Sequence, residues 1–123
     1  MNVRKLSSTS LQNEIALEND CPFIYALSLM GKRWKPAILW KMSEEGCYRF
    51  SGFKREIPQI SEKMLTQHLR ELESDGLITR TVYTEMPLRV EYALTELGLS
   101  LQPILSSLYQ WGDKAQKIKK DFG

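Results

Sequence analysis

Residues 61–76 read SEKMLTQHLRELESDG, and they separate into two faces when they are placed on an α-helix. At about 100° per residue, Leu65, Leu69 and Leu72 fall on one apolar stripe. The opposite face carries the side chains of Lys63, Gln67, Arg70 and Ser74. A helix that docks by leucines and presents lysine, glutamine and arginine outward is suited to the major groove of DNA. The competing interpretation is the ordinary solvated face of an amphipathic helix.

The residues before this helix predict a shorter helix and a tight turn. Ser51 is expected to cap a helix over residues 52–57, which ends before Pro58 because proline pushes its predecessor away from helical angles. Ser61 is expected to cap the next helix, and Gly76 suits a left-handed exit from it. Helix, tight turn and helix in this order predict a helix-turn-helix.

The residues after this helix change from a helical to an alternating pattern. Alternation over residues 78–83 and 88–94 predicts two β-strands joined by a turn. In a winged helix such a hairpin lies against the DNA backbone or the minor groove, and Arg89 is the expected contact there. We therefore expect a fold that is mainly α with a small β-hairpin (α+β), a winged helix-turn-helix with terminal dimerisation helices.

Three further helices are expected nearer the N-terminus. A weak apolar pattern predicts a short helix over residues 11–18. Asp20 and Pro22 mark the start of a second helix, and Gly31 marks its end. A third helix is expected over residues 34–42.

The C-terminal segment carries a heptad seam. Apolar residues follow an alternating four-three spacing at Leu97, Leu101, Ile104, Leu108, Trp111, Ala115, Ile118 and Phe122. The seam is long for so small a domain to cover alone, so we expect a homodimer. Its interface is expected to contain Leu97, Leu101, Ile104, Leu108 and Trp111. Pro103 is expected to interrupt a backbone hydrogen bond and kink this helix.

The expected organisation has three parts within a single small domain. Residues 1–20 form an N-terminal arm with a short helix, residues 21–94 the winged helix-turn-helix, and residues 95–123 the dimerisation helix. The hydrophobic fraction of 42% in 123 residues supplies one core. We find no segment with the length and apolarity of a signal peptide or membrane span, so we expect a cytoplasmic protein without a membrane partner.

The net charge of +2 conceals an uneven distribution. Residues 32–70 hold nine Lys or Arg against four Asp or Glu, whereas residues 71–113 hold two against seven. The basic block coincides with the expected DNA-binding helices. This favours a polyanionic partner, double-stranded DNA.

The sequence offers no motif for catalysis, a cofactor or a metal. Cys21 and Cys47 stand far apart and His68 is the one histidine, so no metal-binding spacing can be assembled. Neither a phosphate-binding glycine loop nor a nucleophile motif is present. We therefore expect neither enzyme activity nor a bound cofactor.

Several ordered blocks resemble the HxlR family of bacterial transcriptional regulators. The blocks are CP at 21–22, GKRWK at 31–35, RF at 49–50, ISEKMLTQ at 60–67, LRELE at 69–73, DGLI at 75–78 and RVEYALTELG at 89–98. The resemblance covers residues 21–112 and implies a homodimer that binds an operator with two half-sites. The candidate DNA-binding residues are Ser61, Lys63, Thr66, Gln67 and Arg70 on the recognition helix and Arg89 at the wing.

The same resemblance makes Cys21 a candidate redox-sensing residue. Some HxlR-like proteins respond to quinones, aldehydes or oxidants through a cysteine near their N-terminal helix. A thiol at a helix N-terminus lies at the positive end of the helix dipole, which favours the reactive thiolate. The alternative is a small, buried and inert thiol. An electrophile or another small molecule is accordingly a candidate effector.

Two function classes follow from these patterns. The first is a dimeric, sequence-specific DNA-binding transcriptional regulator, with repression favoured over activation. The alternative is a protein-interaction module on a winged-helix scaffold that has lost DNA binding. Salt dependence separates the two, because affinity for duplex DNA falls steeply with salt only when several phosphates are contacted.

Overall fold

The computed structural model of the protein describes residues 21–31 and 33–122. The chain divides into two compact units, residues 1–32 and residues 33–123. In the first unit, helix α2 spans Pro22–Met30 and ends at Gly31, whose φ of 70° favours glycine. The expected helix over residues 11–18 lies outside the described residues, as does Asp20. Cys21, and not Asp20, occupies the cap position of α2.

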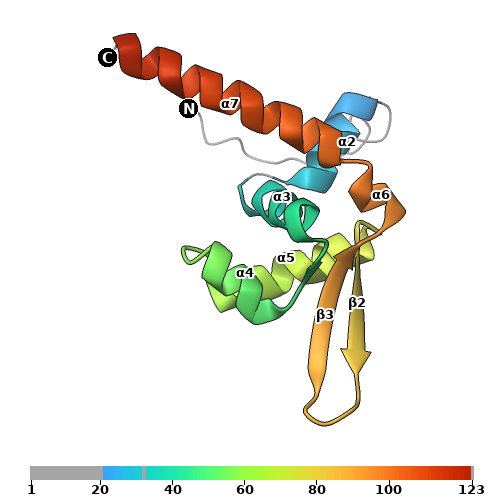
Figure 1. Ribbon diagram of the computed structural model, residues 1–123. Coiled ribbons are helices and arrows are strands. Elements are labelled where there is room, and N and C mark those ends of the chain that lie inside the picture. Colours follow the sequence, from blue (N-terminus) through green and yellow to red (C-terminus); the bar gives the residue numbers. More distant parts are fainter. Residues whose placement is uncertain (1–20, 32, 123) are drawn as a thin grey trace, which may run out of the picture. The chain divides into compact units, whose positions relative to one another are not determined.

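The second unit contains the helix-turn-helix and the hairpin (Figure 1). Its elements are α3 (Trp34–Glu45), β1 (Cys47–Tyr48), α4 (Phe50–Glu56), α5 (Glu62–Ser74), β2 (Ile78–Tyr83), β3 (Arg89–Leu94), α6 (Glu96–Leu99) and α7 (Gln102–Phe122). Helix α3 lies between α7 on one side and the pair α4 and α5 on the other, while the hairpin of β2 and β3 projects past α5. The expected class, mainly α with a small β-hairpin, is confirmed.

The core of this unit forms where α3 meets α4, α5 and the start of the hairpin. Its apolar residues are Ile38, Leu39, Met42, Tyr48, Phe53, Ile57, Ile60, Leu65, Leu69, Leu72, Leu77, Ile78 and Leu105. The Phe53 ring packs edge-on against Tyr48 and Tyr92, with centroid distances of 4.9 and 5.9 Å. Edge-to-face rings of this kind add about 0.5–1.5 kcal/mol to the burial of their surface. The aromatic group thus ties α4 to the sheet.

The sheet has the strand order β1-β3-β2, with antiparallel pairing throughout. Ile78 pairs with Leu94 at one end of the hairpin and Tyr83 pairs with Arg89 at the other. The short strand β1 places Cys47 opposite Ala93. Directly paired residues share a face of the sheet, so this register decides which side chains of the hairpin point toward α5.

The start of α4 differs from the sequence-based expectation. The helix begins at Phe50, and the expectation that Ser51 caps it is wrong. Arg49 occupies the cap position with extended backbone angles and makes no side-chain capping bond. The earlier start is consistent with burial, because it brings Phe53 into the core, where the side chain is 0% exposed. Packing of that ring outweighs the local preference of serine for the cap.

The C-terminal segment is divided into two helices, so the expected single kinked helix over residues 95–123 is corrected. Helix α6 ends after one turn, and α7 begins at Gln102 with Pro103 in its first turn. Proline is tolerated there because the first amides of a helix have no intrahelical acceptor. The proline therefore starts a new helix. Helix α7, with 21 residues, is too polar to cross a bilayer, and no other helix in the described ranges qualifies either.

Candidate nucleic-acid interface

The exposed face of α5 forms the centre of the candidate interface. Leu65, Leu69 and Leu72 are at most 2% exposed, so the helix is docked by the stripe that the sequence predicts. Each such burial contributes about 1.5–3 kcal/mol, which fixes the rotation of the helix about its axis. Lys63, Gln67, Arg70 and Ser74 are exposed on the other side, and Thr66 is half-buried among them.

Side chains fix the turn that leads into α5. Ser61 is the cap residue, and its hydroxyl oxygen accepts a hydrogen bond from the amide of Met64 at 3.1 Å. The ammonium group of Lys54 in α4 donates to the carbonyl oxygen of Ile60. The cap could be predicted because it joins residues three apart in the sequence. The Lys54 bond joins α4 to the turn, and no periodic pattern in the sequence indicates it. Both bonds set the direction in which α5 leaves α4.

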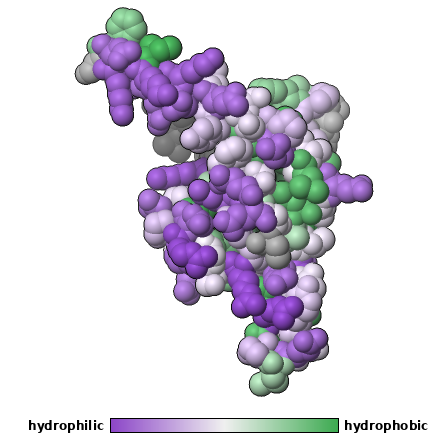
Figure 2. Space-filling view, in the orientation of Figure 1, coloured by the Kyte–Doolittle hydropathy of each residue, from purple (hydrophilic) through white to green (hydrophobic). Residues whose placement is uncertain are grey.

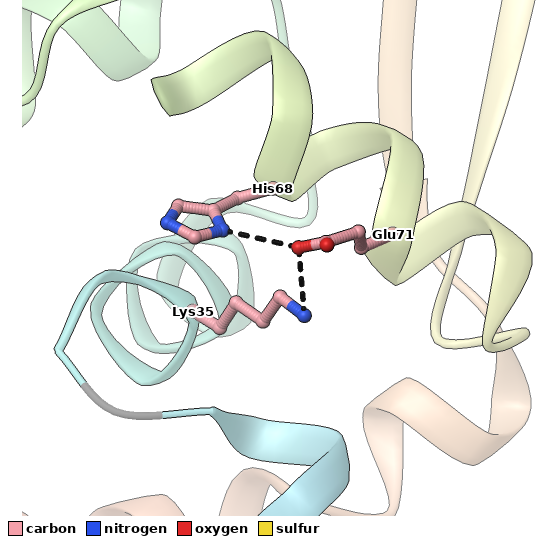
Figure 3. A network of polar contacts seen from close by, with 3 residues as sticks. All are labelled: Lys35, His68 and Glu71. Carbon is pink, nitrogen blue, oxygen red and sulfur yellow. Dashed lines mark hydrogen bonds and ion pairs between the residues drawn. The ribbon is translucent and has the colours of Figure 1, made fainter. Parts of the chain in front are cut away.

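A polar network ties α5 to α3 behind the exposed face (Figure 3). Lys35 Nζ lies 3.0 Å from Glu71 Oε1, and His68 Nδ1 lies 3.4 Å from the same oxygen. The Lys35 side chain is only 12% exposed. Its ammonium group, hydrogen-bonded to the carboxylate, holds the pKa of Glu71 below its ordinary value, and the His68 hydrogen bond acts in the same direction. Glu71 therefore stays ionised and paired at neutral pH.

A hollow of about 540 Å³ lies along the exposed face of α5. Its lining residues are Phe50, Glu62, Lys63, Thr66, Gln67, Arg70 and Glu71. Lys63 and Arg70 supply cations and Glu62 supplies a carboxylate, while the carboxylate of Glu71 is paired with Lys35. Four of the predicted site residues, Lys63, Thr66, Gln67 and Arg70, are thus brought together around one concave surface, while Ser61 stands at the helix start.

Arg89, the expected wing contact, lies in β3 and is engaged within the hairpin. Its guanidinium carbon lies 3.9 Å from the centroid of the Tyr83 ring, and Nε lies 3.4 Å from Glu91 Oε2. Electrostatic attraction to the ring face and to the carboxylate stabilises the guanidinium group in this position. The side chain keeps 35% of its surface exposed. Within the hairpin, Arg89 therefore connects Tyr83 of β2 to Glu91 of β3, and part of its side chain remains exposed.

Sequence reasoning missed Arg80 in β2. Arg80 pairs with Tyr92 and lies between Ile78 and Val82 on the same face of the strand. It lines a second hollow of about 320 Å³ with Thr66, Leu69, Arg70, Glu73 and Tyr92. The available signal was an arginine on the otherwise apolar side of an alternating strand.

The heptad seam lies on the outer side of α6 and α7. Helix α7 packs on α3 through other residues: Leu105 is 4% exposed and the Tyr109 ring stacks on Trp40 at 5.3 Å. The seam residues Leu97, Ile104, Leu108, Trp111, Ile118 and Phe122 are each more than half exposed, whereas Leu101 is half-buried. Figure 2 shows a largely hydrophilic face on the C-terminal half of α7, with a hydrophobic spot at its end.

Cys21 lies at the start of α2 in the first unit. It occupies the cap position, is half-buried and belongs to no disulfide among the described residues. Its carbonyl oxygen accepts the amide of Tyr25 at 2.9 Å. The expected position at a helix N-terminus is therefore observed.

This chain is similar in sequence and in fold to known proteins. The family described as HxlR-like helix-turn-helix matches residues 29–120. An uncharacterized HTH-type transcriptional regulator of Methanothermobacter thermautotrophicus is 50% identical over 92 residues, 75% of this chain and 70% of that protein. Another, of Halalkalibacterium halodurans, is 40% identical over 111 residues, 90% of this chain and 98% of that protein.

Solved structures of a redox regulator agree with these matches. HypR in its reduced form superposes with a TM-score of 0.75 at 39% identity, covering 81% of this chain and 98% of that one. Its oxidized form gives 0.72 at 42% identity, covering 76% and 96%. The chain therefore belongs to the HxlR-like helix-turn-helix family of DNA-binding proteins, and it is a transcriptional regulator with a winged helix-turn-helix fold.

Proposed function

We propose that the protein is a homodimeric repressor that recognises a specific operator through α5. One α5 from each subunit enters the major groove, in two half-sites about one helical turn apart. The observation that carries this proposal is the exposed set of Lys63, Gln67 and Arg70 in front of three buried leucines. Occupied half-sites exclude polymerase from an overlapping promoter without any further contact, which favours repression over activation.

The side chains on α5 divide between bases and backbone. Gln67 lies in the first half of the helix, the part that contacts base edges in helix-turn-helix proteins, and its amide suits the N6 and N7 atoms of adenine. Lys63, Thr66 and the Ser61 hydroxyl are suited to phosphate oxygens. The exposed part of Arg89 contributes a contact from the wing.

The heptad seam supports the dimer. Five apolar side chains on α7, those of Ile104, Leu108, Trp111, Ile118 and Phe122, are each at least 54% exposed. Contiguous apolar surface of this kind marks an interaction site on a small domain. A second copy of the same seam matches it, because a two-fold interface uses one patch twice.

The proposal is tested by the salt dependence of DNA binding. Duplexes selected from a random pool by the protein are titrated by fluorescence anisotropy at increasing KCl. A dimer that contacts six or more phosphates gives a slope of log affinity against log salt of about −5 or steeper. Gln67→Ala should weaken binding to the selected duplex by about 1–3 kcal/mol and leave a scrambled duplex unaffected. A flat slope in the wild type would instead favour the protein-interaction alternative.

A second function, redox sensing through Cys21, has its own support. HypR, a redox regulator with structures in its oxidized and reduced forms, is about 40% identical to this chain. Cys21 is half-buried at a helix N-terminus, where the dipole favours the thiolate. Oxidation of this thiol would shift the equilibrium between conformations that bind the operator with different affinity.

This second function predicts a diamide effect that depends on Cys21. Diamide with added glutathione joins the Cys21 thiol and the glutathione thiol in a mixed disulfide and takes up their two hydrogen atoms. This treatment should change the operator affinity of the wild type by about 5- to 150-fold, the usual range of allosteric coupling. Cys21→Ser should abolish the change, and the matched variant Cys47→Ser should keep it. An effect that persists in Cys21→Ser, or none in the wild type, contradicts sensing at this residue.

A further inference from the structure

A hollow lies between the second half of α5 and the base of the hairpin. It has a volume of about 320 Å³ and is lined by Thr66, Leu69, Arg70, Glu73, Arg80 and Tyr92. Thr66 and Arg70 also line the larger hollow in front of α5, so the two form one continuous surface. The smaller hollow is therefore an extension of the candidate DNA interface toward the wing.

The sheet register holds Arg80 in this place. Its neighbour on the same strand face, Ile78, is 2% exposed, and its paired residue, Tyr92, packs against Phe53. Both anchors turn this face of β2 toward α5. Arg80 itself is exposed, and it lies near the start of the strand, far from the hairpin tip. Its guanidinium group is thus presented from a rigid strand.

The charges around the hollow are two cations and one anion. Within the described ranges, neither Arg70 nor Arg80 has a hydrogen bond or ion pair to a carboxylate. Arg89, on the opposite face of the hairpin, differs because its guanidinium is held by Tyr83 and Glu91. Glu73 lines the same hollow and opposes the two arginines in part. The hollow keeps an excess of positive charge that its own residues leave available.

We propose that Arg70 and Arg80 together hold a single phosphate of the DNA backbone in this hollow. The inference rests on the proposed DNA-binding function and specifies which residue of the hairpin takes part. Arg70 lies about 10 Å beyond Lys63 along the helix axis at 1.5 Å per residue, past the N-terminal part that reads bases. Two planar guanidinium groups that converge on one tetrahedral anion use their fork geometry fully. The pair fixes the register of α5 in the groove through its direct contact with the phosphate.

The experiment measures binding of the full-length protein to a selected duplex in which single phosphates are replaced by neutral methylphosphonates. One position per half-site should weaken wild-type binding roughly tenfold. The same replacement should weaken binding less in Arg80→Ala and in Arg70→Ala, and it should leave the affinity of the double variant unchanged. The slope of log affinity against log salt should become less negative in the double variant, by about 0.9 for each bound subunit. This is the change expected when each subunit loses one phosphate contact and not two.

Matched variants separate this contact from net charge. Lys114→Ala removes one positive charge from an exposed position on α7 and should keep the wild-type sensitivity to the methylphosphonate. Arg80→Lys keeps the charge but loses the fork, so the salt slope should persist while affinity falls. Glu73→Gln removes the opposing charge and should tighten binding to any duplex by about two- to fivefold.

The outcomes distinguish this inference from the function on which it rests. A wild type without salt-dependent duplex binding overturns both. A wild type that binds with a steep slope, together with Arg80 variants that keep full methylphosphonate sensitivity, overturns only the shared phosphate. Unchanged or weaker binding by Glu73→Gln likewise contradicts the proposed charge balance.

Discussion

Replacing Leu108 with glutamate is expected to separate the proposed dimer and to lower operator affinity by about 10²–10⁴-fold, the gain that a linked second site contributes. Leu108 is 54% exposed in the single chain, so a charge at this position disturbs the fold of one subunit little. In the proposed dimer the new carboxylate would face the apolar seam of the partner without a counterion, which is costly. Sedimentation velocity measures the mass, and fluorescence anisotropy measures the affinity.

Gln110→Glu is the matched control for this experiment. Gln110 is exposed on the same helix, roughly 200° around the axis from Leu108. The same added charge at this position should leave both the mass and the operator affinity unchanged. A dimeric Leu108→Glu protein with wild-type affinity would show that the seam is not the interface. A far-UV circular dichroism spectrum like that of the wild type confirms that the subunit is folded.

The second large effect is expected from Gly98→Ala, which should lower the free energy of unfolding by about 3 kcal/mol. A Cβ atom at Gly98 would lie 2.2 Å from the carbonyl oxygen of Leu77. That oxygen also accepts the amide of Thr95 at 3.1 Å, so it cannot move away without loss of this hydrogen bond. For a unit of this size the melting temperature should fall by roughly 12 °C or more. Urea denaturation and thermal circular dichroism measure both quantities.

Gly52→Ala controls for the loss of a glycine as such. A Cβ atom at Gly52 would meet Cδ1 of Tyr48 at 3.7 Å, which is an ordinary van der Waals contact. Alanine is also favoured over glycine within a helix by roughly 0.5–1 kcal/mol, so this variant should be as stable as the wild type or slightly more so. Equal stability of the two alanine variants would mean that the close approach at Gly98 is not a constraint.

Gly98 matters for function because α6 connects the hairpin to the seam. Thr95 caps this helix: its hydroxyl oxygen accepts the amide of Gly98 at 3.1 Å, and its hydroxyl donates to the carbonyl oxygen of Gly76 at 2.6 Å. The end of α5, the start of β2 and the start of α6 therefore meet at one junction. These two hydrogen bonds tie the start of α6 to the turn between α5 and β2.

Features of the fold that depend on near neighbours in sequence were predicted from sequence. The two faces of α5 follow from the positions of Leu65, Leu69 and Leu72, and the structure buries all three. The Ser61 cap and the left-handed Gly76, with φ of 79°, are set by atoms within a few residues. Such signals act over one or two helical turns, so a single sequence carries them completely.

Local signals failed where packing opposed them. Ser51 is a good cap residue, yet burial of the Phe53 ring draws the start of α4 forward to Phe50. Pro103 suggested a kink within one helix, yet α6 ends at Leu99 and α7 begins at Gln102, with the proline in its first turn. At the start of α4, packing of Phe53 against Tyr92, which is remote in sequence, outweighs a capping preference of about 1 kcal/mol.

The amino-acid order alone predicted the family, the fold class and the buried and exposed faces of α5, because periodic burial, caps and turn residues depend on neighbouring positions in the sequence. Which partner each arginine has could be seen only in the folded chain. Strand register and the docking of α5 place Arg89 against Tyr83 and Arg80 beside Arg70. Those pairings join residues whose distance in space is set by the whole core, and no local pattern encodes them.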